Sequence, residues 1–223
     1  IKHMNIQEIL LNYKHIKAKI DVLKKKSNAK TNLIAVSKTF PSQNIEPLIT
    51  EGHFIFGENK VQEASSKWLP LKKKYKNIEL HLIGPLQSNK INAALEVFDV
   101  IETIDREKLV KKISSKIEIG KDTHEFFVQV NTGNEAQKSG LDFSEVKTFV
   151  RWAKNDMKLN ITGLMCIPPV NDNPLEHFKL LRKKKEECNL QHLSMGMSKD
   201  FEIAIENGST LVRVGSAIFG QRS

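Results

Sequence analysis

The residue with the clearest chemical potential is Lys38, which follows an apolar run of strand length. The run from Leu33 to Val36 is partly β-branched, and Pro41 limits how far a strand could extend. Lys38 is therefore expected at the carboxyl end of a buried strand. A lysine there either reaches past the strand end into solvent or, where burial lowers its pKa, forms an imine with an aldehyde. Lys38 alone leaves both interpretations open.

Two segments near the carboxyl end, residues 193–198 and 213–217, combine glycine with serine. Each follows an expected strand and leads toward a turn or helix. A serine hydroxyl and the free N–H groups and dipole of a helix start favour an anion, and small residues let backbone amides approach it closely. As tight turns and helix caps alone, both segments would need no ligand.

An amine and an anion cradle that meet at one rim suggest pyridoxal 5′-phosphate, which has an aldehyde at one end and a phosphate at the other. Arg213 lies two residues before Gly215, so both share one face of a strand. Arg213 could reach the pyridine nitrogen and, because a guanidinium only donates hydrogen bonds, would keep that nitrogen unprotonated. The ring would then be a poor electron sink. The alternative for Arg213 is an internal salt bridge with a glutamate.

Whether these residues meet depends on eight expected strands that alternate with helices. The strands are expected at about 32–37, 54–56, 79–83, 97–102, 125–130, 160–165, 192–195 and 211–214. The helices are expected at about 5–25, 43–51, 60–75, 88–95, 105–117, 144–156, 174–187 and 198–206. Strict alternation to eight strands favours an α/β fold, a single (β/α)8 TIM barrel with an extra N-terminal helix, over an open sheet. In such a barrel phosphate commonly binds after the seventh and eighth strands, facing Lys38 after the first.

Further candidate contacts lie at other strand ends. Asn59 follows the second strand and offers an amide to a ring substituent. Met165 and Met197 could pack on the ring, although Met165 also suits a plain core position. His81 and His192 lie within strands, and we interpret both as interior histidines with hydrogen-bond partners rather than as an acid or a base.

Composition narrows the function classes. The net charge is +9, but the basic runs are spread over predicted helices without aromatic platforms, which favours solvated helix faces over a nucleic-acid surface. No apolar run is long enough to cross a membrane. Cys166 and Cys188 show no CxxC spacing and the histidines are scattered, so we expect a reduced, cytoplasmic compartment and no metal. We expect one domain over 4–223, a monomer, with residues 1–3 a cloning remnant before Met4.

Seven ordered motifs resemble the pyridoxal phosphate homeostasis proteins, the YggS or PROSC family. They are AVSKT (35–39), FGEN (56–59), HLIGPLQSNK (81–90), EAQKSG (135–140), GLM (163–165), LSMGMS (193–198) and RVGSAIFG (213–220). The resemblance implies a barrel like the N-terminal domain of alanine racemase, of fold type III among proteins that bind this cofactor. It also implies an imine on Lys38, phosphate held by Ser194 and the amides of Gly215 and Ser216, Arg213 at the ring nitrogen, and a contact from Asn59.

The resemblance further implies a role in vitamin B6 and amino/keto acid homeostasis. The protein would hold pyridoxal phosphate and deliver it to dependent apoenzymes, without efficient turnover. The alternative is an amino-acid racemase, which needs an acid and a base on opposite faces of the substrate carbon, with Lys38 as one of them. In alanine racemases a tyrosine from a separate carboxyl-terminal domain supplies the other face. The sequence ends at Ser223 and its tyrosines, Tyr13 and Tyr75, lie on predicted helices, so we expect a carrier with at most weak racemase activity.

Overall fold

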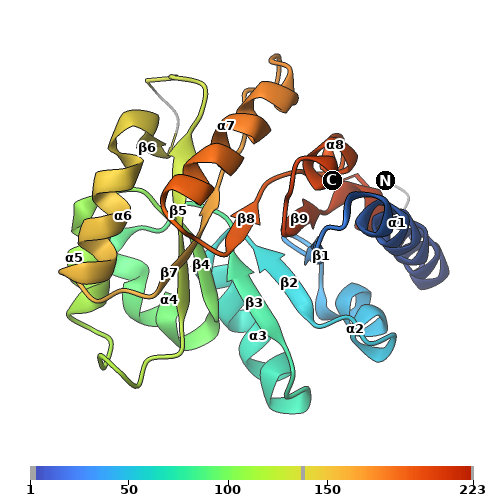
Figure 1. Ribbon diagram of the computed structural model, residues 1–223. Helices are drawn as coiled ribbons and strands as arrows, with labels where there is room; N and C mark the ends of the chain where they lie inside the picture. Colours follow the sequence, from blue (N-terminus) through green and yellow to red (C-terminus); the bar gives the residue numbers. More distant parts are fainter. Residues whose placement is uncertain (1–3, 137–138, 222–223) are drawn as a thin grey trace.

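The computed structural model describes residues 4–136 and 139–221. Within these ranges eight parallel strands close into a barrel, and each is followed by a helix on the outside (Figure 1). The barrel strands are β1 (Asn32–Val36), β2 (Ile55–Glu58), β3 (Glu79–Leu82), β4 (Val100–Ile104), β5 (Glu125–Asn131), β7 (Ile161–Met165), β8 (His192–Ser194) and β9 (Leu211–Val214). Pairing of β1 with β9, with Ala35 opposite Val214, closes the barrel. The predicted fold class is thereby confirmed.

The helices follow the predicted order with some shifts. They are α1 (Ile6–Ser27), α2 (Ser42–Thr50), α3 (Val61–Lys74), α4 (Ile91–Val97), α5 (Glu107–Ser114), α6 (Val146–Asn155), α7 (Pro174–Glu187), α8 (Phe201–Glu206) and α9 (Ser216–Phe219). Two 3-10 turns precede α4 and α6, and the two-residue strand β6 (Leu141–Asp142) extends the sheet beside the end of β5. Neither β6 nor α9 was predicted. The expected remnant at residues 1–3 and positions 137–138 of one motif lie outside the described residues.

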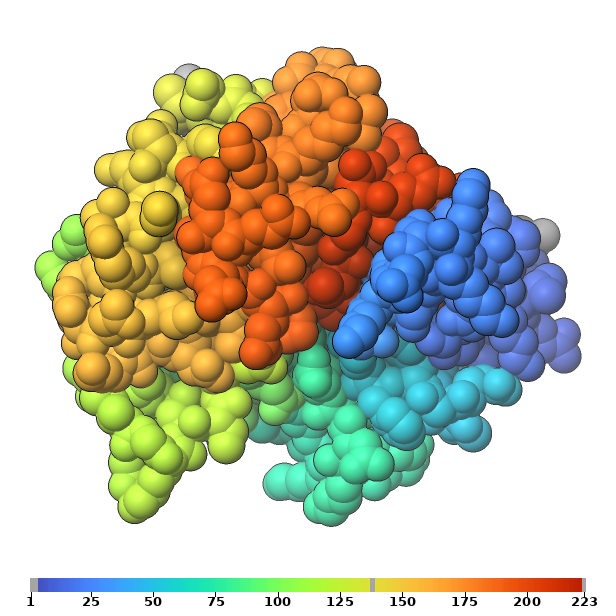
Figure 2. All heavy atoms as spheres, viewed as in Figure 1, coloured from blue at the N-terminus to red at the C-terminus, as the bar shows by residue number. Residues whose placement is uncertain are grey.

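The extra N-terminal helix completes the outer layer where α9 is short. The buried face of α1 consists of Ile9, Tyr13, Ile16 and Ile20, whose spacing of three and four residues gives one apolar stripe. This stripe packs against α8, α9 and α2. Figures 1 and 2 show the blue N-terminal helix lying against the red C-terminal segment. The chain ends therefore meet on one side of the barrel.

Alternation along the strands decides which residues enter the barrel. Ile34 and Val36 belong to a small interior cluster, whereas Leu33 and Ala35 belong to the larger core between strands and helices. Lys38 continues the interior register of Ile34 and Val36 beyond the end of β1. The alternation thus brings the Lys38 side chain to the mouth of the barrel.

The described residues offer no sign of a membrane span or a metal site. No helix there has the length and apolar character needed to span a membrane. The same residues contain no group of three or more His, Cys, Asp or Glu side chains that could hold a metal ion. Cys166 is buried and Cys188 is half-buried, and both are free thiols.

Candidate functional site

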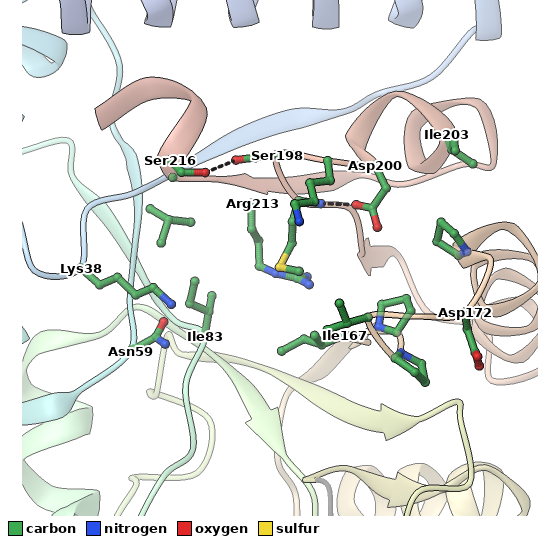
Figure 3. A pocket seen from close by; sticks show the side chains of 18 residues that line it. Lys38, Asn59, Ile83, Ile167, Asp172, Ser198, Asp200, Ile203, Arg213 and Ser216 are labelled. Atoms are coloured by element: carbon green, nitrogen blue, oxygen red, sulfur yellow. Dashed lines mark hydrogen bonds between the residues drawn. The ribbon is translucent and has the colours of Figure 1, made fainter. Parts of the chain in front are cut away.

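A cavity of about 580 Å³ opens at the carboxyl ends of the strands (Figure 3). Its lining comes from several strand ends: Val36 and Lys38 after β1, Asn59 after β2, Ile83 after β3, residues 167–174 after β7, residues 197–203 after β8, and Arg213, Gly215 and Ser216 at β9. In Figure 3 Lys38 and Asn59 lie side by side at one end, with Arg213 between them and the β7–α7 segment. The cavity is where a (β/α)8 barrel places its binding site.

The turn that carries Lys38 is held from outside the barrel. Lys67 on α3 donates hydrogen bonds to the carbonyl oxygens of Ser37 and Phe40, each at 2.8 Å. Its ammonium therefore contacts the turn on both sides of Lys38 and Thr39. Within the turn Thr39 has a φ of +70°, a conformation rare for a residue other than glycine. The Thr39 N–H donates to Glu63 Oε1 at 2.5 Å. These bonds hold the turn that carries Lys38, including the uncommon backbone conformation of Thr39.

A buried carboxylate completes this support. Glu58 Oε1 accepts hydrogen bonds from Ser37 Oγ and Trp68 Nε1, each at 2.8 Å, and pairs with Lys67 Nζ at 2.6 Å. Burial raises the pKa of the Glu58 carboxyl, against the opposing effect of Lys67. We call Glu58, Glu63 and Lys67 the loop clamp.

Asn59 presents an unsatisfied acceptor to the cavity. Its Oδ1 is buried and has no hydrogen-bond partner among the described residues. Gly84 lies directly against the Asn59 backbone, and a Cβ there would be 2.2 Å from the Asn59 carbonyl oxygen. Glycine at this position therefore allows the β3 loop to pack beneath Asn59. A buried acceptor that lacks a donor is costly unless a ligand supplies one.

Small residues and hydroxyls gather at a second part of the cavity, after β8 and β9. The Ser216 hydroxyl and the Ala217 N–H both donate to Ser198 Oγ, each at 3.4 Å. Because α9 begins at Ser216, its first N–H groups lack intrahelical partners. A Cβ at Gly215 would lie 3.2 Å from the Val36 carbonyl oxygen, so only a small residue fits against β1. Two hydroxyls and the backbone amides at the start of α9 together can hold an anion such as phosphate.

The loop that carries Ser198 depends on Gly196. Gly196 has a φ of +97°, and a Cβ there would lie 2.5 Å from the Ala204 Cβ. Asp200 Oδ1 accepts a hydrogen bond from the Met197 N–H at 2.7 Å. The tight turn directs Ser198 toward the cavity and delays the start of α8 to Phe201, whereas a start at Ser198 was predicted.

Arg213 lies between these two parts of the cavity and is buried. Its Nη1 donates to Ser194 Oγ at 2.7 Å and its Nη2 to the Cys166 carbonyl oxygen at 2.8 Å. Ser194 Oγ in turn donates to Glu102 Oε2 at 2.6 Å. The direct salt bridge with a glutamate, which the sequence left open, is replaced by a contact through a hydroxyl.

Six of the eight predicted binding residues line the cavity: Lys38, Asn59, Met197, Arg213, Gly215 and Ser216. The other two predicted residues, Ser194 and Met165, are not part of this lining. Ser194 is fully buried beneath Arg213 and engaged with Glu102, so it does not face the anion end. Met165 is fully buried at the end of β7, opposite Ser194 in the sheet, and does not line the cavity.

The sequence interpretation missed two kinds of residue. Ser198 lines the cavity, and its position two residues after Gly196 was the available signal. Glu102 is the one charged residue of strand β4, and it contacts His81 Nδ1 at 2.8 Å. His81 is confirmed as an interior histidine with partners. His192 is half-exposed and stacks on Phe127, with ring centroids 5.6 Å apart.

Comparisons with known proteins agree with this arrangement. A family model described as "Alanine racemase, N-terminal domain" matches residues 11–223. The pyridoxal phosphate homeostasis protein of Haemophilus influenzae is 37% identical over 99% of this chain and 97% of its own length. The structure of PipY from Synechococcus elongatus with pyridoxal phosphate bound is similar with a TM-score of 0.77 and 29% identity, covering 91% of this chain and 99% of PipY.

A more distant similarity shows the fold alone. Alanine racemase from Bartonella henselae, in a structure with covalently bound pyridoxal phosphate, has a TM-score of 0.73 and 17% identity. It covers 98% of this chain but only 60% of the racemase chain. The shared part is therefore the barrel.

Proposed function

Because the chain belongs to the alanine racemase N-terminal domain family, as one of its pyridoxal phosphate homeostasis proteins, we propose that its cavity binds pyridoxal 5′-phosphate. The observation that carries the proposal is that Lys38 and the anion end, formed by Ser198, Gly215 and Ser216, line the same cavity. The Lys38 amine would condense with the cofactor aldehyde, forming one C=N bond and releasing one water. The phosphate would take the hydroxyls and amides of the anion end.

The remaining cavity groups suit the ring between these two ends. Arg213 uses two of its donors on Ser194 and Cys166, and a guanidinium can only donate. A donor that reaches the pyridine nitrogen keeps it unprotonated. The Asn59 Oδ1, which has no partner among the described residues, would accept a hydrogen bond from a ring substituent. When bound, the cofactor supplies a reactive aldehyde and an electron-accepting ring. An unprotonated ring nitrogen makes the ring a weaker electron acceptor.

These groups favour a carrier over a racemase. Both tyrosines of the chain have partners away from the cavity: Tyr13 packs edge-on against His53, and Tyr75 donates to Glu46 Oε2 at 2.8 Å. Neither can act as the second acid or base opposite Lys38. We therefore propose that the protein holds pyridoxal phosphate for vitamin B6 and amino/keto acid homeostasis. It would act as a cytoplasmic monomer and pass the cofactor to dependent apoenzymes.

Absorbance spectroscopy with borohydride reduction tests the proposal. We expect the purified protein mixed with pyridoxal phosphate to show an imine band that borohydride bleaches, with the reduced adduct on Lys38 by peptide mass spectrometry. Lys38→Ala should abolish both. Lys199→Ala is the matched control because Lys199 lines the same cavity but is exposed. An imine band that persists in Lys38→Ala, or an adduct on Lys199 instead, would contradict the proposal.

A second measurement addresses the alternative. Inversion of D- or L-alanine should not exceed that of free pyridoxal phosphate at the same concentration. Inversion well above that rate, lost in Lys38→Ala, would replace the carrier by a racemase. In that case an acid other than the tyrosines would have to act from the cavity wall.

A further inference from the structure

A chain of hydrogen bonds runs through the barrel interior below the cavity. Arg213 Nη1 contacts Ser194 Oγ at 2.7 Å, and Ser194 Oγ contacts Glu102 Oε2 at 2.6 Å. Glu102 Oε1 contacts His81 Nδ1 at 2.8 Å, and His81 Nε2 contacts Glu79 Oε1 at 2.7 Å. The members come from β9, β8, β4 and β3. We call Arg213, Ser194, Glu102, His81 and Glu79 the interior relay.

The direction of each bond follows from the donors available. Arg213 can only donate, so Ser194 Oγ accepts from it and must give its single proton to Glu102. Glu102 accepts on both oxygens, as a carboxylate does. Burial disfavours the charged form of His81, but hydrogen bonds to Glu102 and Glu79 outweigh it and raise the pKa of His81 to about 9. His81 therefore donates from both nitrogens, and charges alternate along the relay.

The interior relay compensates the positive charge of the buried Arg213. Arg213 is only 3% exposed, and no carboxylate of the described residues lies within 4 Å of its guanidinium. A buried cation without compensation is costly. The Ser194 hydroxyl links Arg213 to the negatively charged Glu102 by two hydrogen bonds. These bonds hold Nη1 of Arg213 toward the barrel interior. The Cys166 carbonyl fixes Nη2. The remaining N–H donors are those left to meet a ligand.

We infer that Ser194 and Glu102 are positioning residues that orient Arg213 and so set the hydrogen bonding of the ring nitrogen of a bound cofactor. The inference rests on the proposed function. It assigns Ser194 a role that differs from the phosphate contact expected of it. If the relay only filled the barrel, removing a member would lower stability without changing the electronic state of the ring.

The test uses the full-length protein loaded with pyridoxal phosphate labelled with ¹⁵N in the ring. Ser194→Ala removes the bridging oxygen, and Glu102→Gln removes the charge but keeps the shape. Both should shift the ring ¹⁵N resonance and the imine absorption maximum, and weaken cofactor affinity on the order of ten-fold. Ser209→Ala is the matched control. Ser209 is a buried serine beside the same strands, and its hydroxyl bonds the carbonyl oxygens of Leu193, Met195 and Leu211 rather than Arg213.

The outcomes separate the inference from the function on which it rests. Wild-type resonance, absorption and affinity in both relay variants would overturn the inference while leaving the imine on Lys38 intact. Ser209→Ala with the same spectral shift as Ser194→Ala would also overturn it, because general loosening would then be the cause. Should Glu102→Gln fail to fold, Ser194→Ala decides alone, since it only deletes one oxygen. Absence of a reducible imine in the wild type would count against the proposed function instead.

Discussion

Replacing Lys67 by methionine should destabilise the fold and loosen the turn that carries Lys38. The Lys67 side chain is only 8% exposed and pairs with Glu58 at 2.6 Å. Its ammonium also donates to the carbonyl oxygens of Ser37 and Phe40, each at 2.8 Å. Methionine keeps an apolar stem of similar length but offers none of these bonds. The substitution therefore leaves a buried carboxylate without its cation and removes one donor from each of two carbonyl oxygens, of which that of Ser37 keeps the Phe40 N–H at 3.1 Å.

The magnitude follows from these contacts. Removing one partner of a buried ion pair costs about 3–5 kcal/mol. Glu58 keeps its bonds from Ser37 and Trp68, which places the loss toward the lower end of that range. For a domain of this length such a loss lowers the melting temperature by about 10 °C. The penalty also depends on pH. Without Lys67, the pKa of Glu58 rises further above its ordinary 4.5, so the folded state holds a proton that the unfolded state releases, and stability falls as pH rises above 4.5.

Denaturant unfolding at pH 5 and pH 8 measures both effects. We expect a smaller deficit for Lys67→Met at pH 5 than at pH 8, and partial recovery at pH 8 in the double variant with Glu58→Gln, which has no unpaired charge. Lys73→Met, at an exposed position on the same helix, is the control and should change stability by less than about 0.5 kcal/mol. A deficit below about 1 kcal/mol at pH 8, or equal deficits at both pH values, would refute the loop clamp as described.

Four other predictions concern the site and the pH dependence of stability. Gly196→Ala should lower unfolding stability by at least about 2 kcal/mol in denaturant titrations, because its Cβ would lie 2.5 Å from that of Ala204 at a φ of +97°. Stability should fall by ~3 kcal/mol as pH rises from the unfolded His81 pKa of 6.5 through its folded pKa of about 9, and His81→Gln should flatten that slope. The stability of the wild type should also fall as pH drops from 6.5 toward 4, because burial lowers the pKa of His53 to about 4. A wild-type stability that does not change with pH would contradict the predictions for His81 and His53. Ser198→Ala should weaken inorganic phosphate binding several-fold by calorimetry with unchanged stability, and unchanged affinity would remove Ser198 from the anion end.

The sequence was sufficient for the barrel and for the place of Lys38 at the carboxyl end of the first strand. The side-chain period of two along a strand then puts Lys38 on the interior face with Ile34 and Val36. Strand β4 was predicted at 97–102 but lies at Val100–Ile104. Val97 ends α4 instead, and an apolar run shared by a helix end and a strand start has no periodicity that separates them.

The height of a residue along the barrel axis could not be predicted from the sequence. Ser194 was expected to contact phosphate, but it lies at the end of β8, where it pairs with Leu211, two residues short of Arg213 along β9. Height along the barrel axis depends on the stagger between neighbouring strands, which only the closed sheet defines. For the same reason the hydrogen bonds of Glu102 with His81 and Ser194 could not be predicted from the sequence, although it shows all three residues. The turn at Gly196 brings Ser198, rather than Ser194, to the cavity lining.

The polar interior and the proposed specificity have one physical origin. A guanidinium held inside a barrel must keep its charge and have its donors satisfied, and the relay and the Cys166 carbonyl satisfy those on the inner side. The remaining N–H groups of Arg213 can form hydrogen bonds only with an acceptor in the cavity. Under the proposed function, with Lys38 at one end and the anion end formed by Ser198, Gly215 and Ser216 at the other, the site would select a molecule with a carbonyl, a phosphate and an unprotonated acceptor between them. The same selection would disfavour the protonated ring that efficient carbanion chemistry needs, so the proposed holding of the cofactor and its slow turnover would both follow from the arrangement of Arg213.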